Sequence, residues 1–237
     1  MWRVGLDAGA DALAAHLADD EHARAARFRF DRDRRRYVVA RGRLREILGR
    51  YLDVPPERVS FQYGPQGKPE LCPETEDAAP GHGLTFNLSH AGEHALVVVA
   101  RGRRVGVDLE PVRALPDADI IAERFFSASE VAAYRALPEA ARPAAFFACW
   151  TRKEAFVKAL GDGLTHPLDT FDVSVAPEAA VPLLRVSGVD ARAVGWDACD
   201  VPLGLDHAAA VAASGPGWHL VVWHDPALAP APIPLPR

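Results

Sequence analysis

Cysteine is scarce in this chain of 237 residues: there are three, and no two of them stand close together. Three scattered cysteines leave one over in any pairing, which argues against a disulfide framework and against a zinc site. No apolar stretch approaches the length of a membrane span. The first residues carry acidic side chains early and no apolar run, so we expect no signal peptide. These absences predict a cytoplasmic protein that does not enter a membrane.

An excess of positive charge is also lacking, because 27 Lys and Arg stand against 32 Asp and Glu, for a net charge of -5. There is therefore no global basic field for nucleic acid. Arginines nevertheless crowd residues 24–36, where they could form a nucleic-acid patch, a solvated helix face or a phosphate clamp. Few aromatic residues are interleaved with them, which disfavours a nucleic-acid partner.

Hydrophobic periodicity predicts an α+β fold. A chain of this length can form one large domain or two small ones. Apolar residues recur at helical spacing in some segments and alternate in others. We predict helices over residues 12–18, 37–51, 120–126, 129–137 and 143–160, and strands over 84–90, 94–100, 105–110, 171–175, 183–186, 207–213 and 219–223. A hairpin turn at 101–104 is expected to join two of the strands.

A short internal echo suggests two similar halves. Val4-Gly-Leu-Asp7 resembles Val105-Gly-Val-Asp108, and each is followed by helices and then by strands. We therefore predict an N-terminal half at 1–104 and a C-terminal half at 105–226. Each half would be a small antiparallel sheet with helices. The Pro- and Ala-rich residues 227–237 are expected to form a poorly ordered tail.

Three carboxylates are candidates for a metal site. The strand period of two projects Asp108 and Glu110 from one face, and side-by-side carboxylates repel unless a cation or a proton joins them. A solvated outer strand face is the competing interpretation. Glu154 of the helix adds a third oxygen ligand, and Mg²⁺ favours a few carboxylates with waters and phosphates. Zinc is disfavoured because no His or Cys has ligand spacing nearby, and Mn²⁺ is not separated from Mg²⁺ by these ligands.

The helix at 143–160 also pairs Glu154 with Lys158, which lies four residues later on the same face. Taken alone, the pair is typical of an ordinary surface ion pair. Elsewhere, Ser89, His90 and Gly92 at the end of a strand are suited to donating hydrogen bonds to an anion. A Ser89–His90 nucleophile pair is disfavoured because adjacent strand residues point to opposite faces. Lys68 lies in a stiff Gly-Lys-Pro turn, and taken alone it is more typical of an exposed turn lysine than of a ligand contact.

Taken together, these motifs resemble the 4′-phosphopantetheinyl transferases of the Sfp type. The resemblance covers roughly residues 24–170 and is carried by five segments: Gly67-Lys-Pro69, Phe86-Asn-Leu-Ser-His-Ala-Gly92, Gly106-Val-Asp-Leu-Glu110, Arg124-Phe-Phe-Ser127 and Trp150-Thr-Arg-Lys-Glu-Ala-Phe-Val-Lys158. It implies a pseudo-twofold pair of α+β halves with coenzyme A in the cleft between them. It also implies a Mg²⁺-dependent holo-[acyl-carrier-protein] synthase activity. The acceptor would be the serine of an acyl, peptidyl or aryl carrier protein, and 3′,5′-ADP would leave.

The resemblance assigns roles residue by residue. Asp108, Glu110 and Glu154 match the metal ligands, with Asp108, Glu154 and Lys158 as the catalytic set. Lys158 matches the lysine on the pyrophosphate. The remaining matches concern coenzyme A: Gly67, Lys68 and Pro69 at the nucleotide, Ser89 and His90 near the adenosine 3′-phosphate, and Arg24 and Arg36 on the 3′-phosphate side. Tyr37 departs from the pattern, because some relatives carry a small hydroxyl residue there.

The implied function has two alternatives. One is a degenerate relative that binds coenzyme A or a carrier protein without transfer, against which the intact acidic cluster and Lys158 both count. The other is a nucleic-acid binder acting through residues 24–36, which would show steep salt dependence. The sequence does not say whether fatty-acid, polyketide or nonribosomal-peptide synthesis is served. Two halves in one chain need no partner subunit to complete a cleft, so we expect a monomer.

Overall fold

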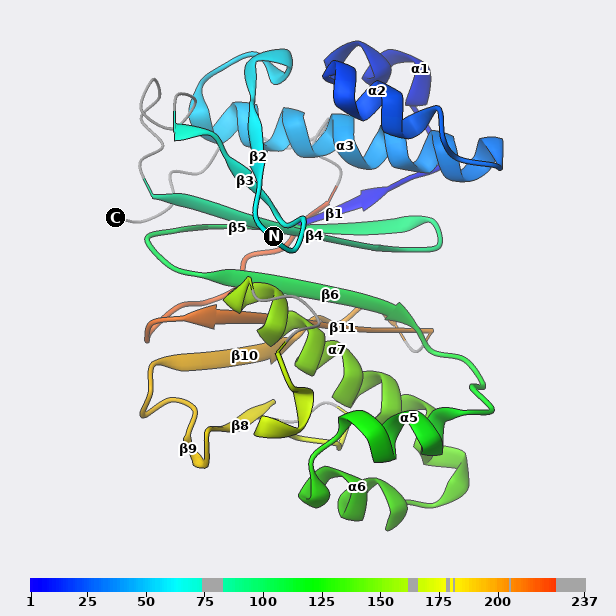
Figure 1. Cartoon of the computed structure of the whole chain (residues 1–237), viewed down its shortest axis with the longest axis vertical. Coiled ribbons are helices and arrows are strands. Elements are labelled where there is room, and N and C mark those ends of the chain that lie inside the picture. The colour runs from blue at the N-terminus through cyan, green and yellow to red at the C-terminus, as the bar shows by residue number, and fades with distance from the viewer. Residues whose placement is uncertain (74–82, 162–165, 178–179, 181, 205, 225–237) are drawn as a thin grey trace. The chain divides into compact units, whose positions relative to one another are not determined.

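The computed structural model describes residues 1–73, 83–161, 166–177, 180, 182–204 and 206–224. The chain forms two compact units, the first made of Met1–Gly102 with the described residues 220–224, and the second of Arg103–His219. Each unit combines helices with sheets whose strands are antiparallel, apart from one parallel pair in the first unit (Figure 1). The α+β fold class is therefore confirmed.

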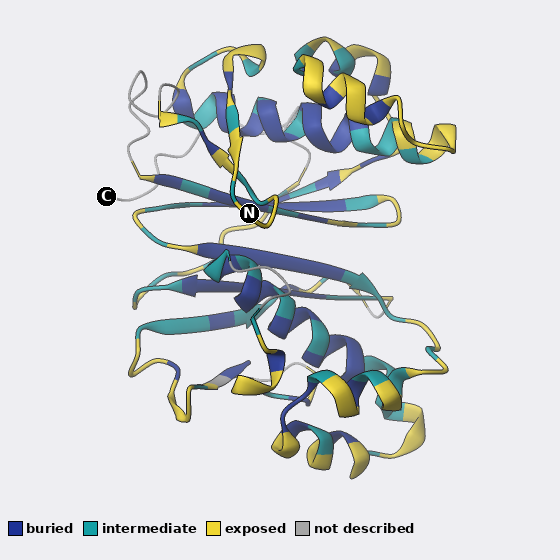
Figure 2. Ribbon diagram, viewed as in Figure 1, coloured by how far each residue is buried: buried dark blue, intermediate teal, exposed yellow. Residues whose placement is uncertain are grey.

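The first unit is a four-stranded sheet in the order β12-β1-β5-β4 with one long helix, α3, over it (Figure 1). Leu44, Ile47 and Leu48 of α3 are fully buried and share one core with the sheet residues Trp2, Phe86 and others. These buried residues account for the dark blue colour in the middle of α3 in Figure 2. The elements are β1 (Trp2–Gly5), α1 (Ala10–Leu13), α2 (Asp19–Ala25), α3 (Asp31–Leu52), β2 (Phe61–Tyr63), β3 (Pro69–Leu71), β4 (Leu84–Ala91), β5 (His94–Arg101) and β12 (Trp223–His224).

The second unit is built around a long helix, α7, that packs on strands β6 and β11. Its main sheet has the order β10-β11-β6, and β7, β8 and β9 form a smaller one. Phe146, Phe156 and Phe171 lie in its core. The elements are β6 (Val105–Pro111), α5 (Ala118–Phe125), α6 (Ala128–Arg135), α7 (Arg142–Leu160), β7 (Phe171–Val173), β8 (Leu183–Val186), β9 (Val189–Asp190), β10 (Trp196–Asp200) and β11 (His207–Ser214). Short 3₁₀ helices lie at Ala14–His16, Pro56–Arg58, Glu139–Ala141 and Leu168–Thr170.

The two units repeat one topology. In the first, β1 pairs antiparallel with β5, which pairs with β4. In the second, β6 pairs antiparallel with β11, which pairs with β10. Each opening strand is followed by short helices, a long helix and short strands, two in the first unit and three in the second, before the last two strands. The Val-Gly-x-Asp echo therefore marks the opening strand, or its end, in each repeat.

Three details differ from the sequence-based expectations. Residues 101–104 do not form a hairpin, because β5 pairs with β1 and β4 whereas β6 pairs with β11. The last strand is β12 in the first unit rather than a strand of the second sheet, because Trp223 pairs with Trp2 and stacks on its ring at 5.8 Å. Strand β10 was not predicted, since Trp196–Asp200 lacks a run of alternating apolar residues. The expected tail at 227–237 lies outside the described residues.

The described cysteines Cys72, Cys149 and Cys199 are free thiols, as expected. Among the described residues, no helix is long and apolar enough to cross a membrane.

A capping box fixes the start of α6, and it gives a first test of the fold. The Ser127 hydroxyl accepts from the Glu130 amide, the Glu130 carboxylate accepts from the Ser127 amide, and Ser127 Oγ also donates to Asp172. We expect Ser127→Ala to cost about 1 kcal/mol in a urea unfolding titration. Ser129→Ala, which loses bonds to Asp172 and to the Ser127 hydroxyl but no bond to a backbone amide, should cost less than about 0.5 kcal/mol. Equal losses in the two variants would contradict the capping role.

Candidate functional site

A glycine brings helix α7 into contact with strand β6. A Cβ placed on Gly106 would lie 2.1 Å from the carbonyl oxygen of Ala155 and 2.4 Å from the amide nitrogen of Ala159. Real Cβ atoms essentially never approach backbone so closely, so only glycine fits at this position. The helix therefore lies directly on the strand, and residues next to these contact points meet residues next to Gly106.

That contact creates an acidic cluster with one lysine in the second unit. Asp108 and Glu110 come from β6, and Glu154 and Lys158 come from α7. Lys158 Nζ donates to Asp108 Oδ1 at 2.6 Å, and the Asp108 side chain is only 5% exposed. The four residues that the sequence singled out for this site are thus gathered by one strand and one helix. The bond from Lys158 crosses from the helix to the strand.

Burial and repulsion from neighbouring carboxylates disfavour the ionised form of both glutamates in this cluster. Burial raises the pKa of Glu154, and the charges of Asp108 and Glu110 raise it further, while Lys158 lowers it. Burial and the charge of Asp108 likewise raise the pKa of Glu110, opposed by Lys158 and Arg113. Each glutamate thus responds to the other carboxylates as well as to desolvation. A cation bound here would relieve the repulsion.

A hard divalent cation fits this donor set by its chemistry. Glu154 Oε1 is buried and has no hydrogen-bond partner among the described residues, a state that costs free energy unless a ligand or ion reaches the oxygen. Carboxylate oxygens are the ligands that Mg²⁺ prefers, and it takes only a few from the protein. Within the described ranges, however, no three His, Cys, Asp or Glu side chains converge as a finished metal cage. The candidate ligands Asp108, Glu110 and Glu154 therefore stay a prediction.

The opposite side of α7 is locked in place by two buried cations. Lys153 Nζ pairs with Glu130 at 2.7 Å and donates to the carbonyls of Leu168 and Phe171, and its side chain is fully buried. Arg152 forms two hydrogen bonds with Asp200 and further bonds to backbone carbonyls. These contacts fix the rotation of the helix about its axis. They orient the neighbouring Glu154 toward β6.

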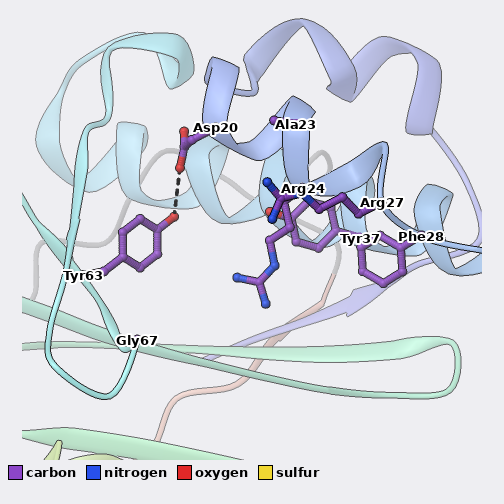
Figure 3. A pocket seen from close by; sticks show the side chains of 8 residues that line it. All are labelled: Asp20, Ala23, Arg24, Arg27, Phe28, Tyr37, Tyr63 and Gly67. Carbon is purple, nitrogen blue, oxygen red and sulfur yellow. Dashed lines mark hydrogen bonds between the residues drawn. The ribbon is translucent and has the colours of Figure 1, made fainter.

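The first unit holds a separate cavity of about 720 Å³ lined by aromatic rings and guanidiniums. Figure 3 shows Arg24, Arg27, Phe28 and Tyr37 on one side and Tyr63 with Gly67 on another. The Arg24 guanidinium lies 5.7 Å from the centre of the Tyr37 ring. A carboxylate, Asp20, also lines the cavity, and the Tyr63 hydroxyl donates to it at 3.5 Å. Flat rings beside positive charges suit a planar anionic ligand.

A second cavity of about 350 Å³ places Arg36 with His90 and Gly92, and it shares Phe28 and Tyr37 with the first. Arg24 and Arg36 thus line neighbouring hollows, as expected for basic residues near one ligand. Arg36 is not isolated there: it donates twice to Asp7, at 2.6 and 3.1 Å. The hydrogen bond from Arg36 lowers the pKa of Asp7. A phosphate binding at Arg36 would compete with this carboxylate.

The remaining sequence-predicted residues of the first unit lie on strands and a turn. Ser89 is buried in β4 and the next residue, His90, is exposed, as strand alternation requires. Lys68 lies in the turn between β2 and β3, where the Gly64 amide donates to its carbonyl. Gly67 has φ +75°, a left-handed conformation that glycine adopts without strain. Pro69 opens β3 opposite Tyr63.

Sequence reasoning missed part of the larger cavity. Asp20, Phe28 and Tyr63 line it but were not selected as site residues. Phe28 lies within the arginine-rich segment, and an aromatic residue among arginines is the signal that the sequence offered. Asp20 gave no signal, because its role depends on a hydroxyl 43 positions away.

Comparison with known proteins gives one family for both parts of the chain. Residues 104–212 match the profile of the 4′-phosphopantetheinyl transferase superfamily, and residues 6–102 match that of the 4′-phosphopantetheinyl transferase N-terminal region. The chain is 39% identical over 227 residues to the 4′-phosphopantetheinyl transferase HetI of Nostoc sp., an alignment that covers 94% of this chain and 91% of that protein.

Two further similarities are at lower identity. A 4′-phosphopantetheinyl transferase from Bacillus pumilus is 32% identical over 72% of this chain and 69% of its own length. Among solved structures, holo-[acyl-carrier-protein] synthase of Thermotoga maritima matches 47% of this chain and 62% of its own with 23% identity and a TM-score of 0.34. That structural similarity is too low to support an argument.

Proposed function

Because the chain belongs to the 4′-phosphopantetheinyl transferase superfamily, and is therefore an enzyme that transfers phosphopantetheine to a carrier protein, we propose that coenzyme A is its donor. A serine of an apo acyl, peptidyl or aryl carrier protein is the acceptor, and 3′,5′-ADP is the leaving group. The observation that carries the proposal is the cluster of Asp108, Glu110, Glu154 and Lys158, assembled where α7 lies on Gly106. It combines a fixed ammonium with carboxylates able to hold a hard cation.

In the reaction, the carrier serine oxygen forms a bond to the β-phosphorus of coenzyme A. The bond from that phosphorus to the bridging oxygen breaks, and the electron pair leaves with 3′,5′-ADP. Phosphoryl transfer needs positioning and charge neutralisation more than covalent help from the protein. Lys158 supplies a permanent positive charge for the pyrophosphate, held in place by its bond to Asp108.

Asp108, Glu110 and Glu154 would hold Mg²⁺, with Mn²⁺ as the alternative ion. A divalent cation at these carboxylates supplies Lewis-acid neutralisation of pyrophosphate charge. Glu154 is also positioned to accept the serine proton, directly or through a water. Its raised pKa makes it a better base than an ordinary glutamate. A carboxylate committed to a metal is a weaker base, so the two roles of Glu154 compete.

The nucleotide end of coenzyme A is assigned to the cavities of the first unit. Phe28, Tyr37 and Tyr63 offer ring faces for adenine, and Arg24 and Arg36 offer charge for the 3′-phosphate. Gly67, Lys68, Pro69, Ser89 and His90 complete the predicted nucleotide contacts. We further propose a monomer in a reducing cytoplasm, in keeping with three free thiols.

The test is intact-mass spectrometry of an apo carrier protein incubated with this enzyme, coenzyme A and Mg²⁺, with and without EDTA. We expect one phosphopantetheine arm on the carrier serine, with the gain abolished by EDTA and restored by excess Mg²⁺. A gain that is unaffected by EDTA would remove the metal from the proposal. No gain with any of several carrier types, while coenzyme A still binds, would favour a binding protein without transfer.

A further inference from the structure

One buried carboxylate of the first unit belongs to neither proposed ligand site. Glu21 lies in α2, and its side chain is 1% exposed. Its Oε1 accepts from Arg41 at 2.5 Å and its Oε2 from Arg45 at 2.7 Å. The same Oε2 accepts from the Ala18 amide at 3.0 Å, which closes the start of α2. Glu21 therefore joins α2 to α3 through two charge-assisted contacts.

The two arginines carry this connection to the β2–β3 hairpin. The guanidiniums of Arg41 and Arg45 lie 4.7 and 5.1 Å from the ring centre of Phe61 in β2. Arg45 also donates to the carbonyl of Val59 at 2.6 Å, just before that strand. Arg41 donates to the Tyr63 hydroxyl at 3.0 Å. Cation–π and charge-assisted bonds of this kind are directional, so they set the hairpin's position as well as its stability.

The connected elements carry opposite walls of the 720 Å³ cavity. Helix α2 bears Asp20 and Arg24, and the β2 strand and its turn bear Tyr63 and Gly67. Glu21 lies one residue from Asp20 and three from Arg24, and it is not itself a lining residue. The chain of contacts from Glu21 through Arg41 to Tyr63, and from Tyr63 to Asp20, returns to the helix from which it starts. It fixes the separation of the two walls.

This arrangement depends on Glu21 because its negative charge is paired with two buried positive charges. Arg41 and Arg45 are four apart on one helix face, both nearly fully buried, at 8% and 3% side-chain exposure. Without the carboxylate, two like charges would face each other in a site with little water. They would move apart toward solvent and take Phe61 and Tyr63 with them.

We propose that Glu21 is a positioning residue for the nucleotide end of coenzyme A: through Arg41, Arg45 and Tyr63 it sets the distance between Arg24 and the hairpin wall. The inference rests on the proposed function, because it takes the cavity to be the nucleotide site. Glu21 touches neither substrate nor reacting atoms. Its loss should therefore weaken nucleotide recognition and leave the phosphoryl transfer step nearly unchanged.

The experiment compares coenzyme A with dephospho-coenzyme A, which lacks the 3′-phosphate, as donors for carrier loading. In the wild type, kcat/KM should be higher for coenzyme A. In Glu21→Gln, the ratio of the two kcat/KM values should fall about tenfold, through KM for coenzyme A, with kcat within about twofold. Tyr63→Phe keeps the ring but loses the hydroxyl, and it should lower the same ratio by a smaller factor. This variant tests the inference if Glu21→Gln does not fold.

The control separates positioning from simple destabilisation. Leu52→Ala makes a cavity in the same unit at a fully buried site and reduces the folded fraction for both donors alike, so the ratio should not change. If Glu21→Gln and Tyr63→Phe keep the wild-type ratio, the inference is overturned. Calorimetric titration with 3′,5′-ADP distinguishes failure of this inference from failure of the proposed function. A wild type that loads carriers but binds no 3′,5′-ADP overturns the inference while transfer stands, and a wild type that loads no carrier refutes the proposed function itself.

Discussion

Gly106→Ala is expected to destabilise the second unit by about 3 kcal/mol or more and to abolish carrier loading. The new methyl group would lie 2.1 Å from the Ala155 carbonyl and 2.4 Å from the Ala159 amide, and neither backbone atom can turn aside as a side chain can. Overpacking of this kind costs roughly 1–3 kcal/mol where side chains yield, and more where they cannot. Helix α7 would have to move from β6 by about 1 Å, and a displacement of that size can cost roughly 10²-fold in rate. Urea unfolding and intact-mass loading measure the two effects.

Gly5→Ala is the matched control, because Gly5 holds the same place in the Val-Gly-x-Asp echo of the first unit. A Cβ on Gly5 meets no atom within 4 Å, so this variant should keep wild-type stability within about 0.5 kcal/mol and load carriers normally. If Gly106→Ala were as stable and active as Gly5→Ala, the close approach of α7 to β6 would not be what assembles the cluster.

Glu154→Gln is expected to lower kcat by about 10²–10³-fold and, in the same protein, to raise the melting temperature without added metal. The rate falls because the substitution removes a metal ligand and a base in one step. Stability rises because burial and the charges of Asp108 and Glu110 all oppose the Glu154 carboxylate, as its raised pKa indicates. A neutral amide of the same shape removes that repulsion. A site that gains stability when its activity is lost is typical of catalytic clusters.

Melting temperatures with EDTA and with Mg²⁺ measure this directly. Mg²⁺ should stabilise the wild type, since a ligand that binds only the folded state raises its stability, and should stabilise Glu154→Gln less. Glu139→Gln, at an exposed position, should match the wild type throughout. Loss of Mg²⁺ stabilisation together with turnover would assign Glu154 to the metal and leave its role as base open. Full activity of Glu154→Gln would exclude both roles.

The sequence alone determined the local chemistry of this protein. Alternation predicted the strand that carries Asp108 and Glu110, and helical spacing predicted the helix that carries Glu154 and Lys158. The α+β fold class was also readable, because hydrophobic periods depend on residues near one another in the chain. Motif resemblance then predicted the family, which the comparisons confirm.

Tertiary structure decided which of these elements meet. Residues 101–104 looked like a hairpin turn but connect two sheets, because the choice between β5 and β11 as the partner of β6 depends on residues about a hundred positions away. Lys158 bonds to Asp108, 50 positions away in the chain, because Gly106 sets the helix against the strand. The contacts of Glu21 with Arg41 and Arg45 gave no sequence signal at all. A sequence does not distinguish a buried carboxylate from an exposed one, because only tertiary packing determines which side chains are removed from water.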